Sequence, residues 1–134
     1  MKTPLRLLPI ALLALWACSR DRDLPPPYRS LAVPEARLAS APARQRGRAL
    51  FLEHCALCHG EHADGRGIRR NLSSRPVSFT DLEWRRRATP RLVYHLLREG
   101  KQGTAMPAWK VLDEDQTWDL VAYVLSVAGE PPGG

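Results

Sequence analysis

The chain has 134 residues, of which 44% are hydrophobic and 25% charged, and its formal net charge is +6. This length allows one ordinary domain. The composition excludes a collagen-like or wholly disordered chain, and three cysteines are too few for a disulfide-dense scaffold. The basic residues are scattered, with no run longer than residues 85–87, so the positive charge gives no case for nucleic acid binding.

The first part of the chain predicts export. Two basic residues precede a twelve-residue apolar run, residues 7–18. This run is shorter than the about 20 residues that span a membrane and is typical of a secretory signal. It ends in Leu-Trp-Ala-Cys at Cys18, which resembles the lipoprotein box of bacteria, where the cysteine receives a diacylglyceryl group. We expect residues 1–17 to be a signal peptide and Cys18 to be lipidated; cleavage near Ala17 without lipidation and an uncleaved short anchor are the alternatives.

Residues 18–41 are predicted to be the lipidated N-terminus and a proline-rich linker. Four prolines fall in this stretch, three of them consecutive at positions 25–27, and it shows little apolar periodicity. Proline-rich segments are extended and semi-rigid, and the 23 residues 19–41 span at most about 75 Å. We therefore expect a tether that lifts a domain off a membrane surface, with the protein facing the periplasm or the cell exterior.

Residues 42–129 predict a single all-α domain, followed by a short tail at 130–134. Apolar spacing indicates a first helix over residues 43–55. Thr89 is a predicted N-cap for a helix that ends at Gly100, and a third helix is predicted to start after Asp113 and end near Gly129. No segment with period-two alternation is long enough for a sheet. A domain this small often needs a cofactor or another internal link to be stable.

Cys55, Cys58 and His59 form a Cys-x-x-Cys-His motif directly after the first predicted helix. This is the attachment motif for c-type haem, because two thiols three residues apart can add to the two vinyl groups of one haem while the histidine binds the iron. A thioredoxin-like dithiol would lie near a βαβ pattern, and a structural zinc site needs four ligands. The sequence contains neither a βαβ pattern nor a set of four zinc ligands. The motif therefore predicts one covalent haem c, and a chance occurrence of the pattern is the remaining alternative.

The second axial ligand is predicted by elimination. Met106 is the only methionine besides the initiator, and it lies in a loop beside a proline, between the second and third predicted helices. Three histidines are the alternatives. His95 is expected on the solvated flank of its helix, His62 is too close to the motif to reach the opposite haem face, and His54 is expected to pack in the core. The predicted iron ligands are therefore the motif histidine and Met106.

These features together carry a family resemblance. Gly47 and Phe51 on the first helix, and Leu120 and Tyr123 on the last, resemble the helix pair of class I c-type cytochromes, in which a glycine lets the two helices cross closely. Residues 42–129 are similar throughout to this small monohaem cytochrome c fold, and especially to haem domains of respiratory oxidase subunits.

The resemblance also extends to the haem pocket. Met106 and Trp109 resemble the loop that supplies the sixth iron ligand in the family. The resemblance further implies that Pro76 supplies the backbone carbonyl that binds the outer nitrogen of His59. Pro76 and Trp109 are thus candidate haem-pocket residues.

A haem whose two axial sites are both filled by the protein leaves no open site for a substrate. The pieces therefore imply a one-electron carrier, not an enzyme, that shuttles electrons between membrane or periplasmic redox partners. Residues 64–101 carry ten basic and four acidic side chains, so a partner with an acidic docking surface is expected. The main alternative is a haem c subunit of a larger oxidase or dehydrogenase. A haem sensor or peroxidase with an open sixth site, and a non-haem redox or zinc protein, are the others.

Overall fold

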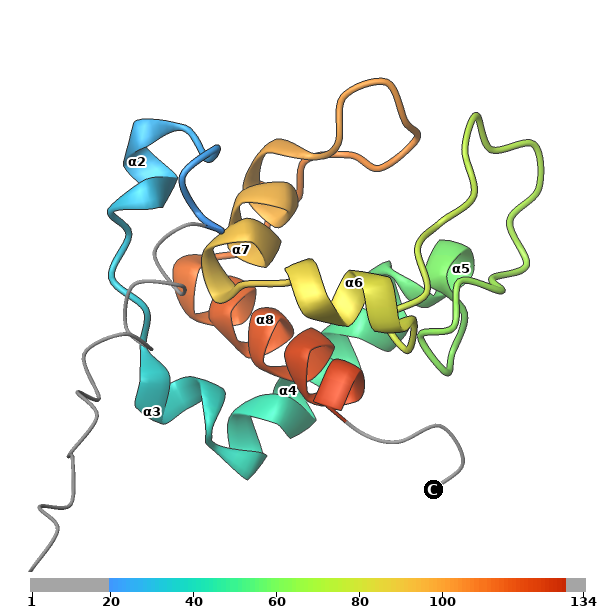
Figure 1. Ribbon diagram of the computed structural model, residues 1–134. Coiled ribbons are helices and arrows are strands. Elements are labelled where there is room, and N and C mark those ends of the chain that lie inside the picture. The colour runs from blue at the N-terminus through green and yellow to red at the C-terminus, as the bar shows by residue number, and fades with distance from the viewer. Residues whose placement is uncertain (1–19, 130–134) are drawn as a thin grey trace, which may run out of the picture.

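The computed structural model describes residues 20–129, so the predicted signal peptide, Cys18 and the predicted tail lie outside the described residues. Every regular element in residues 20–129 is an α-helix, which confirms the predicted all-α fold class (Figure 1). In chain order the helices are α2 (Pro26–Arg29), α3 (Glu35–Leu38), α4 (Ala41–His54), α5 (Ala56–His59), α6 (Leu82–Arg87), α7 (Pro90–Glu99) and α8 (Glu114–Gly129). None of the helices in residues 20–129 is both long enough and apolar enough to cross a membrane.

The core is built around the crossing of α4 and α8 (Figure 1). The largest fully buried side chains are Phe51 on α4 and Leu120, Val121 and Thr117 on α8. The two helices are in close contact at Gly47, where a Cβ atom would lie 1.9 Å from the backbone oxygen of Asp119. No side chain fits in that space, so the close crossing requires glycine at this position.

The helix ends follow local sequence signals. The Thr89 hydroxyl accepts a hydrogen bond from the amide of Leu92, 3.1 Å away, as predicted for the N-cap of α7. Asp113 and Gln116 each accept from the other's amide, at 2.7 and 3.0 Å, which starts α8 where predicted. The first long helix begins two residues earlier than predicted, because the Ser40 hydroxyl caps it. Helix α6 was not predicted, since its sequence is polar and only six residues long.

The predicted tether is wrong for the described residues 20–41, because this segment folds against the domain. It forms α2 and α3, which pack on α7 and α8 respectively. The side chain of Leu24 is buried, and Tyr28, Leu31 and Val33 are half-buried against the core. Leu24, Tyr28 and Leu31 are spaced four and three residues apart, which is a helical spacing, but the prolines at positions 25–27 led to the prediction of an extended segment. Each packs singly against a surface that the rest of the chain provides.

Candidate haem site

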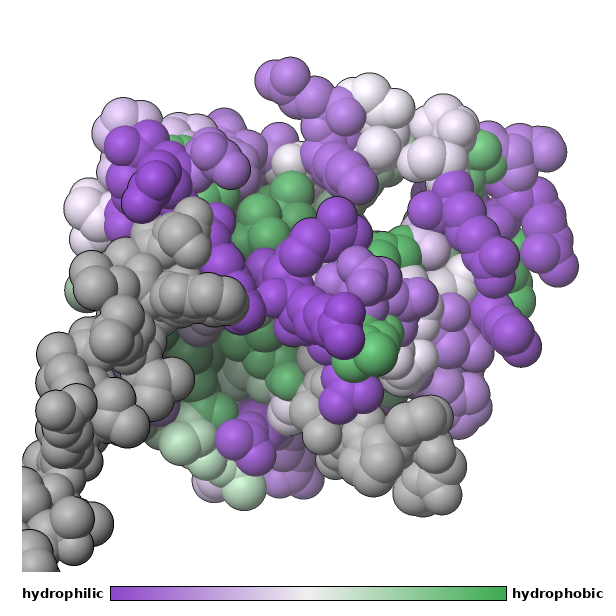
Figure 2. All heavy atoms as spheres, viewed as in Figure 1, coloured by the Kyte–Doolittle hydropathy of each residue, from purple (hydrophilic) through white to green (hydrophobic). Residues whose placement is uncertain are grey.

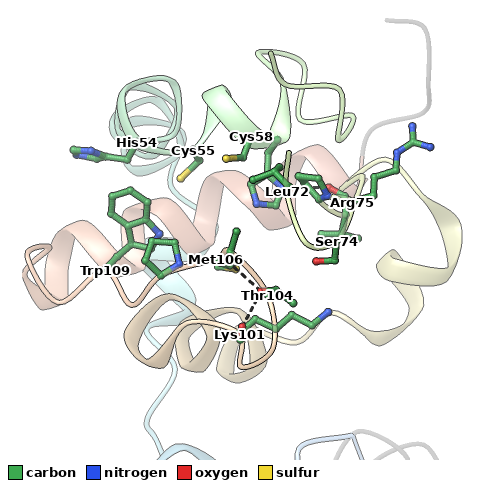
Figure 3. A pocket seen from close by; sticks show the side chains of 15 residues that line it. His54, Cys55, Cys58, Leu72, Ser74, Arg75, Lys101, Thr104, Met106 and Trp109 are labelled. Carbon is green, nitrogen blue, oxygen red and sulfur yellow. Dashed lines mark hydrogen bonds between the residues drawn. The ribbon is translucent and has the colours of Figure 1, made fainter. Parts of the chain in front are cut away.

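A cavity of about 730 Å³, including its open mouth, lies between α5 and the loop that follows α7. Cys55 and Cys58 line one wall, and Met106 and Trp109 face them from the other (Figure 3). His59 also lines this cavity. The structure thus brings the predicted haem-binding residues of the motif and the loop together in one place.

The short helix α5 positions the two thiols. The Cys58 amide donates to the carbonyl of Cys55 at 3.1 Å, which closes a helical turn. Residues three apart on such a turn share a face, so both sulfur atoms point into the cavity (Figure 3). Both are free thiols. Burial, with a smaller contribution from neighbouring Cys58, raises the pKa of Cys55 to about 12, so this side chain is a neutral thiol at neutral pH.

The His59 imidazole is held in one tautomer. Its Nδ1 atom lies 3.2 Å from the carbonyl oxygen of Val77. A carbonyl only accepts, so Nδ1 carries the hydrogen and Nε2 keeps its lone pair free for a metal. Burial lowers the pKa of His59, against the opposing effect of the hydrogen bond to Val77. The Phe79 ring stacks on the imidazole, with centroids 4.8 Å apart and planes 20° apart.

The predicted role of the Pro76 carbonyl is wrong by one residue. Pro76 lines the cavity, but its carbonyl oxygen faces Gly65, where a Cβ atom would lie only 2.7 Å from it. Successive carbonyls of an extended segment point to opposite sides. The carbonyl of Val77 therefore turns toward His59 when that of Pro76 turns away. A backbone partner leaves no mark in the side-chain sequence that could have located it.

The opposite wall is a loop attached to the end of α7. The Met106 carbonyl accepts from the amide of Lys101 at 3.2 Å, and the Met106 amide donates to the hydroxyl of Thr104 at 3.2 Å. The Trp109 amide donates to the carbonyl of Leu97, in α7, at 2.7 Å. Met106 and Trp109 are half-buried against the core. These bonds hold the loop with its thioether directed at the cavity.

The other histidines occupy different positions. His54 lines the cavity rim, and its ring lies 5.3 Å from that of Trp109. His62 is exposed and is not among the lining residues. His95 was expected to be solvated, and this is wrong: its ring packs 4.6 Å from that of Tyr28, and its Nδ1 is buried with no partner within residues 20–129. The folded N-terminal segment, which the sequence did not indicate, covers it.

Several lining residues were not singled out from the sequence. Leu72 and Ser74 come from the long loop before α6, and Lys101 and Thr104 come from the loop after α7. The Lys101 side chain extends along the floor of the cavity in Figure 3, whereas Arg75 at the edge points outward. Only position relative to the cavity distinguishes these residues from other polar loop residues, and that position follows from the fold.

The residues present fit a covalently bound haem. Two thiols and an imidazole with a free Nε2 line one wall, and a thioether faces them from the other. Imidazole and thioether are the axial donors of electron-transfer haems. The remaining lining is largely apolar, as a porphyrin requires.

Comparisons with known proteins agree with this arrangement. Residues 42–124 match the family model described as cytochrome C oxidase, cbb3-type, subunit III. The chain is 30% identical over 95 residues to the cbb3-type cytochrome c oxidase subunit CcoP of Azospirillum brasilense, which covers 69% of this chain and 31% of that protein. It is 29% identical over 118 residues to the subunit FixP of Rhizobium meliloti, covering 78% of this chain and 39% of that protein.

The chain therefore spans about a third of the length of these curated relatives. Among solved structures, a chain of the reducing HAO-like protein complex of Kuenenia stuttgartiensis aligns with a TM-score of 0.51 and 26% sequence identity, over 63% of this chain and 41% of that chain. The region matched by the family model contains α4 without its first residue, α5 to α7, most of α8 and both walls of the cavity. The chain belongs to the family of cbb3-type cytochrome c oxidase subunit III, as a class I c-type cytochrome domain whose cofactor is haem c and which serves electron transfer.

Proposed function

We propose that this protein passes single electrons as a haem c subunit of a larger oxidase-type complex. The observation that carries the proposal is the opposition of the motif thiols and Met106 across one cavity, in a chain whose curated relatives are named as oxidase subunits. The expectation of a free shuttle between partners has less support, because no relative reported above is named as a free carrier.

In the proposed site, protein side chains hold the haem and leave no position on the iron open to a substrate. Cys55 and Cys58 would hold the haem through two thioether bonds, while His59 Nε2 and Met106 Sδ would bind its iron. When bound, haem supplies a one-electron ferric/ferrous couple. The Val77 carbonyl orients the imidazole and increases its basicity. The soft Met106 thioether, bound to the iron, would favour the reduced state and so raise the potential.

The ligand set can be tested on the full-length protein produced with haem-maturation enzymes. We expect a thioether-to-iron charge-transfer band in the oxidised protein and its loss in Met106→Ala. Val111→Ala is the matched control, since this side chain is 80% exposed and does not line the cavity. A wild-type protein without the band, or a band that persists in Met106→Ala, would rule out the proposed ligand pair.

Membership of a complex is tested by purification from the native membrane in mild detergent. We expect the chain to co-purify with oxidase subunits in a fixed ratio, and we expect haem stain and oxidase activity in the same fraction. Recovery of the haem-loaded chain alone, at the mass of a monomer, would favour the free-carrier alternative instead.

The partner surface is proposed to be the loop of residues 65–76. It carries four exposed arginines, Arg66, Arg69, Arg70 and Arg75, and no ion pair within residues 20–129 involves any of them. The loop lies against the motif, where the Arg69 amide donates to the carbonyl of Leu57 at 3.0 Å. Leu57 and Ile68 there are 50% and 75% exposed. Figure 2 shows apolar side chains among hydrophilic ones in this part of the molecule, at the right of the view.

An acidic partner would meet these arginines with an apolar contact at the centre, an arrangement common in protein interfaces. Arg69→Glu with Arg70→Glu should slow electron transfer with an acidic redox protein about tenfold at low salt, and the difference should vanish at high salt. Arg22→Glu is the charge-matched control, since Arg22 is exposed and lies in the N-terminal segment, away from the loop (Figure 1). Rates that do not depend on salt would exclude this docking surface.

Membrane attachment through a lipid on Cys18, on the periplasmic or outer side, also stays a proposal. The lipoprotein-box resemblance supports it. Radiolabelled fatty acid should enter the wild-type chain and not Cys18→Ser, which should leave the membrane fraction. A label that persists in Cys18→Ser would contradict it.

A further inference from the structure

The N-terminal segment that packs on the domain forms hydrogen bonds with α7 at both ends of the helix. We call residues 20–31 the clasp. At the start of α7, the buried Asp21 carboxylate accepts from the Thr89 hydroxyl at 2.5 Å and from Arg91 Nη1 at 3.1 Å. Arg91 Nε also donates to the carbonyl of Leu31 at 2.8 Å. A carboxylate at this end is further favoured by the helix dipole.

At the other end of α7, the clasp contacts the last turn through Tyr28. Its hydroxyl donates a hydrogen bond to the carboxylate of Glu99, the final residue of the helix. Its ring packs 4.6 Å from that of His95 and 6.4 Å from that of Tyr94. Figure 1 shows α2, which carries Tyr28, beside α7.

The same last turn of α7 holds the loop of Met106. A Cβ atom on Gly100 would lie 2.8 Å from the Met106 carbonyl oxygen, so the loop is in direct contact with the helix end. Gly100 has φ +73°, which favours glycine and turns the chain sharply into the loop. At the far side of the loop, Lys110 Nζ lies 3.9 Å from Glu99 Oε2. Glu99 therefore joins Tyr28 on one side to the end of the Met106 loop on the other.

From this connection we infer that Tyr28 is a positioning residue for Met106, and that the clasp keeps the ligand loop closed over the haem cavity. The inference rests on the proposed ligation by Met106. A loop held at both ends samples fewer conformations than a free loop. Less conformational entropy is therefore lost when its thioether takes up the ligand position. Releasing the clasp should therefore let an outside ligand compete better for the position of Met106.

The test compares full-length, haem-loaded wild type with Tyr28→Phe. The substitution keeps the ring beside His95 and removes only the hydroxyl that donates a hydrogen bond to Glu99. Arg22→Gln is the control within the clasp, because Arg22 is exposed and no ion pair or side-chain hydrogen bond of residues 20–129 involves it. The first readout is binding of imidazole to the oxidised protein, and the second is hydrogen exchange of the backbone amides of Lys101 and Trp109.

In Tyr28→Phe we expect imidazole affinity to rise about fivefold, the factor that corresponds to one hydrogen bond of ordinary strength. The Lys101 and Trp109 amides should exchange faster by a similar factor, while amides in the middle of α8 keep their protection. The Arg22→Gln protein should match wild type in both readouts.

Two outcomes would overturn the inference. One is unchanged imidazole affinity and unchanged loop exchange in Tyr28→Phe. The other is faster exchange throughout α8 as well as the loop, which would make Tyr28 a general stabiliser and not a positioning residue. A wild-type protein without the thioether band would instead count against ligation by Met106, and loop exchange would still decide whether the clasp restrains the loop.

Discussion

At the residue scale, two single positions fix features of the protein that no other arrangement of the same atoms would allow. Gly47 lets α4 meet α8 because a Cβ there would overlap the backbone oxygen of Asp119. The carbonyl of Val77 selects the tautomer of His59, because only one imidazole nitrogen can donate to it. The first requirement sets the fold, and the second sets the chemistry of the cavity.

Gly47→Ala should lower the free energy of unfolding by about 3 kcal/mol, because the added methyl group must push two packed helices apart. Urea denaturation of the haem-loaded protein, followed by circular dichroism, measures this. Gly103→Ala is the control: its Cβ meets nothing within 4 Å, although its φ of +75° adds a strain of about 1 kcal/mol. Equal losses for the two variants would contradict the steric explanation.

Tyr28 predicts how stability changes at high pH. Burial, and then the hydrogen bond to Glu99, raise the pKa of Tyr28 from 10.0 to about 12, with Tyr94 adding to the rise and Arg98 opposing it. His95 also faces the ring. The folded state thus holds the phenolic proton more tightly than the unfolded state. The stabilisation is complete below about pH 10 and is lost as pH rises through about 12.

This sign can be measured by comparing wild type with Tyr28→Phe at increasing pH. The urea midpoint of wild type should fall more steeply than that of Tyr28→Phe between about pH 10 and about pH 12. Parallel curves for the two proteins would show that the Tyr28 proton plays no part.

At the scale of elements, three helices meet at one carboxylate. Asp119 on α8 is only 4% exposed. It accepts from Arg46 Nε on α4 at 2.6 Å and from Arg37 Nη1 on α3 at 3.1 Å. The buried carboxylate thus ties the N-terminal segment to the central helix pair by charge as well as by packing.

Asp119→Ala should cost about 2 kcal/mol of stability, less than a fully buried pair because both arginines reach solvent. Asp115→Ala is the matched control, since Asp115 pairs with the same Arg37 at 2.8 Å but is 74% exposed, and it should cost less than about 0.5 kcal/mol. Thermal unfolding of both variants checks this. Similar losses would mean that burial of the carboxylate is unimportant.

At the scale of the whole molecule, the haem cavity lies beside the hydrophobic core that α4 and α8 form. Cys55, Met106 and Trp109 line this cavity and are half-buried, each packed against the core. A small domain buries little apolar surface to offset its loss of chain entropy, and a haem held by Cys55 and Cys58 would bury more. Its stability should therefore depend on the cofactor.

Cys55→Ala combined with Cys58→Ala, which removes both attachment points, should lower the melting temperature by about 10 °C or more, or about 2 kcal/mol for a chain this size. Scanning calorimetry of wild type and the double variant, both made with haem-maturation enzymes, measures the difference. Leu57→Ala, in the same turn but 50% exposed, should change it little. Equal melting temperatures would show that the stability of the fold does not depend on haem attachment.

The features that the sequence predicted correctly are those whose signals are local. Thr89, Asp113 and Gln116 cap helices through atoms within three residues, and the Cys-x-x-Cys-His motif is a single helical turn. The all-α fold and the family followed from these and from apolar spacing. The outer boundary of the first helix and the short α6 were missed, because single turns depend on caps more than on periodicity.

Only the tertiary structure decided which carbonyl faces His59, what covers His95, and where residues 20–41 lie. Each of these depends on a contact between distant parts of the chain, as between Tyr28 and Glu99 or Asp21 and Thr89. The sequence by itself determined the three long helices α4, α7 and α8 and the cofactor motif, since those depend mainly on neighbours in the chain. The clasp packs on a surface formed by distant parts of the chain, so its local pattern alone could not place it.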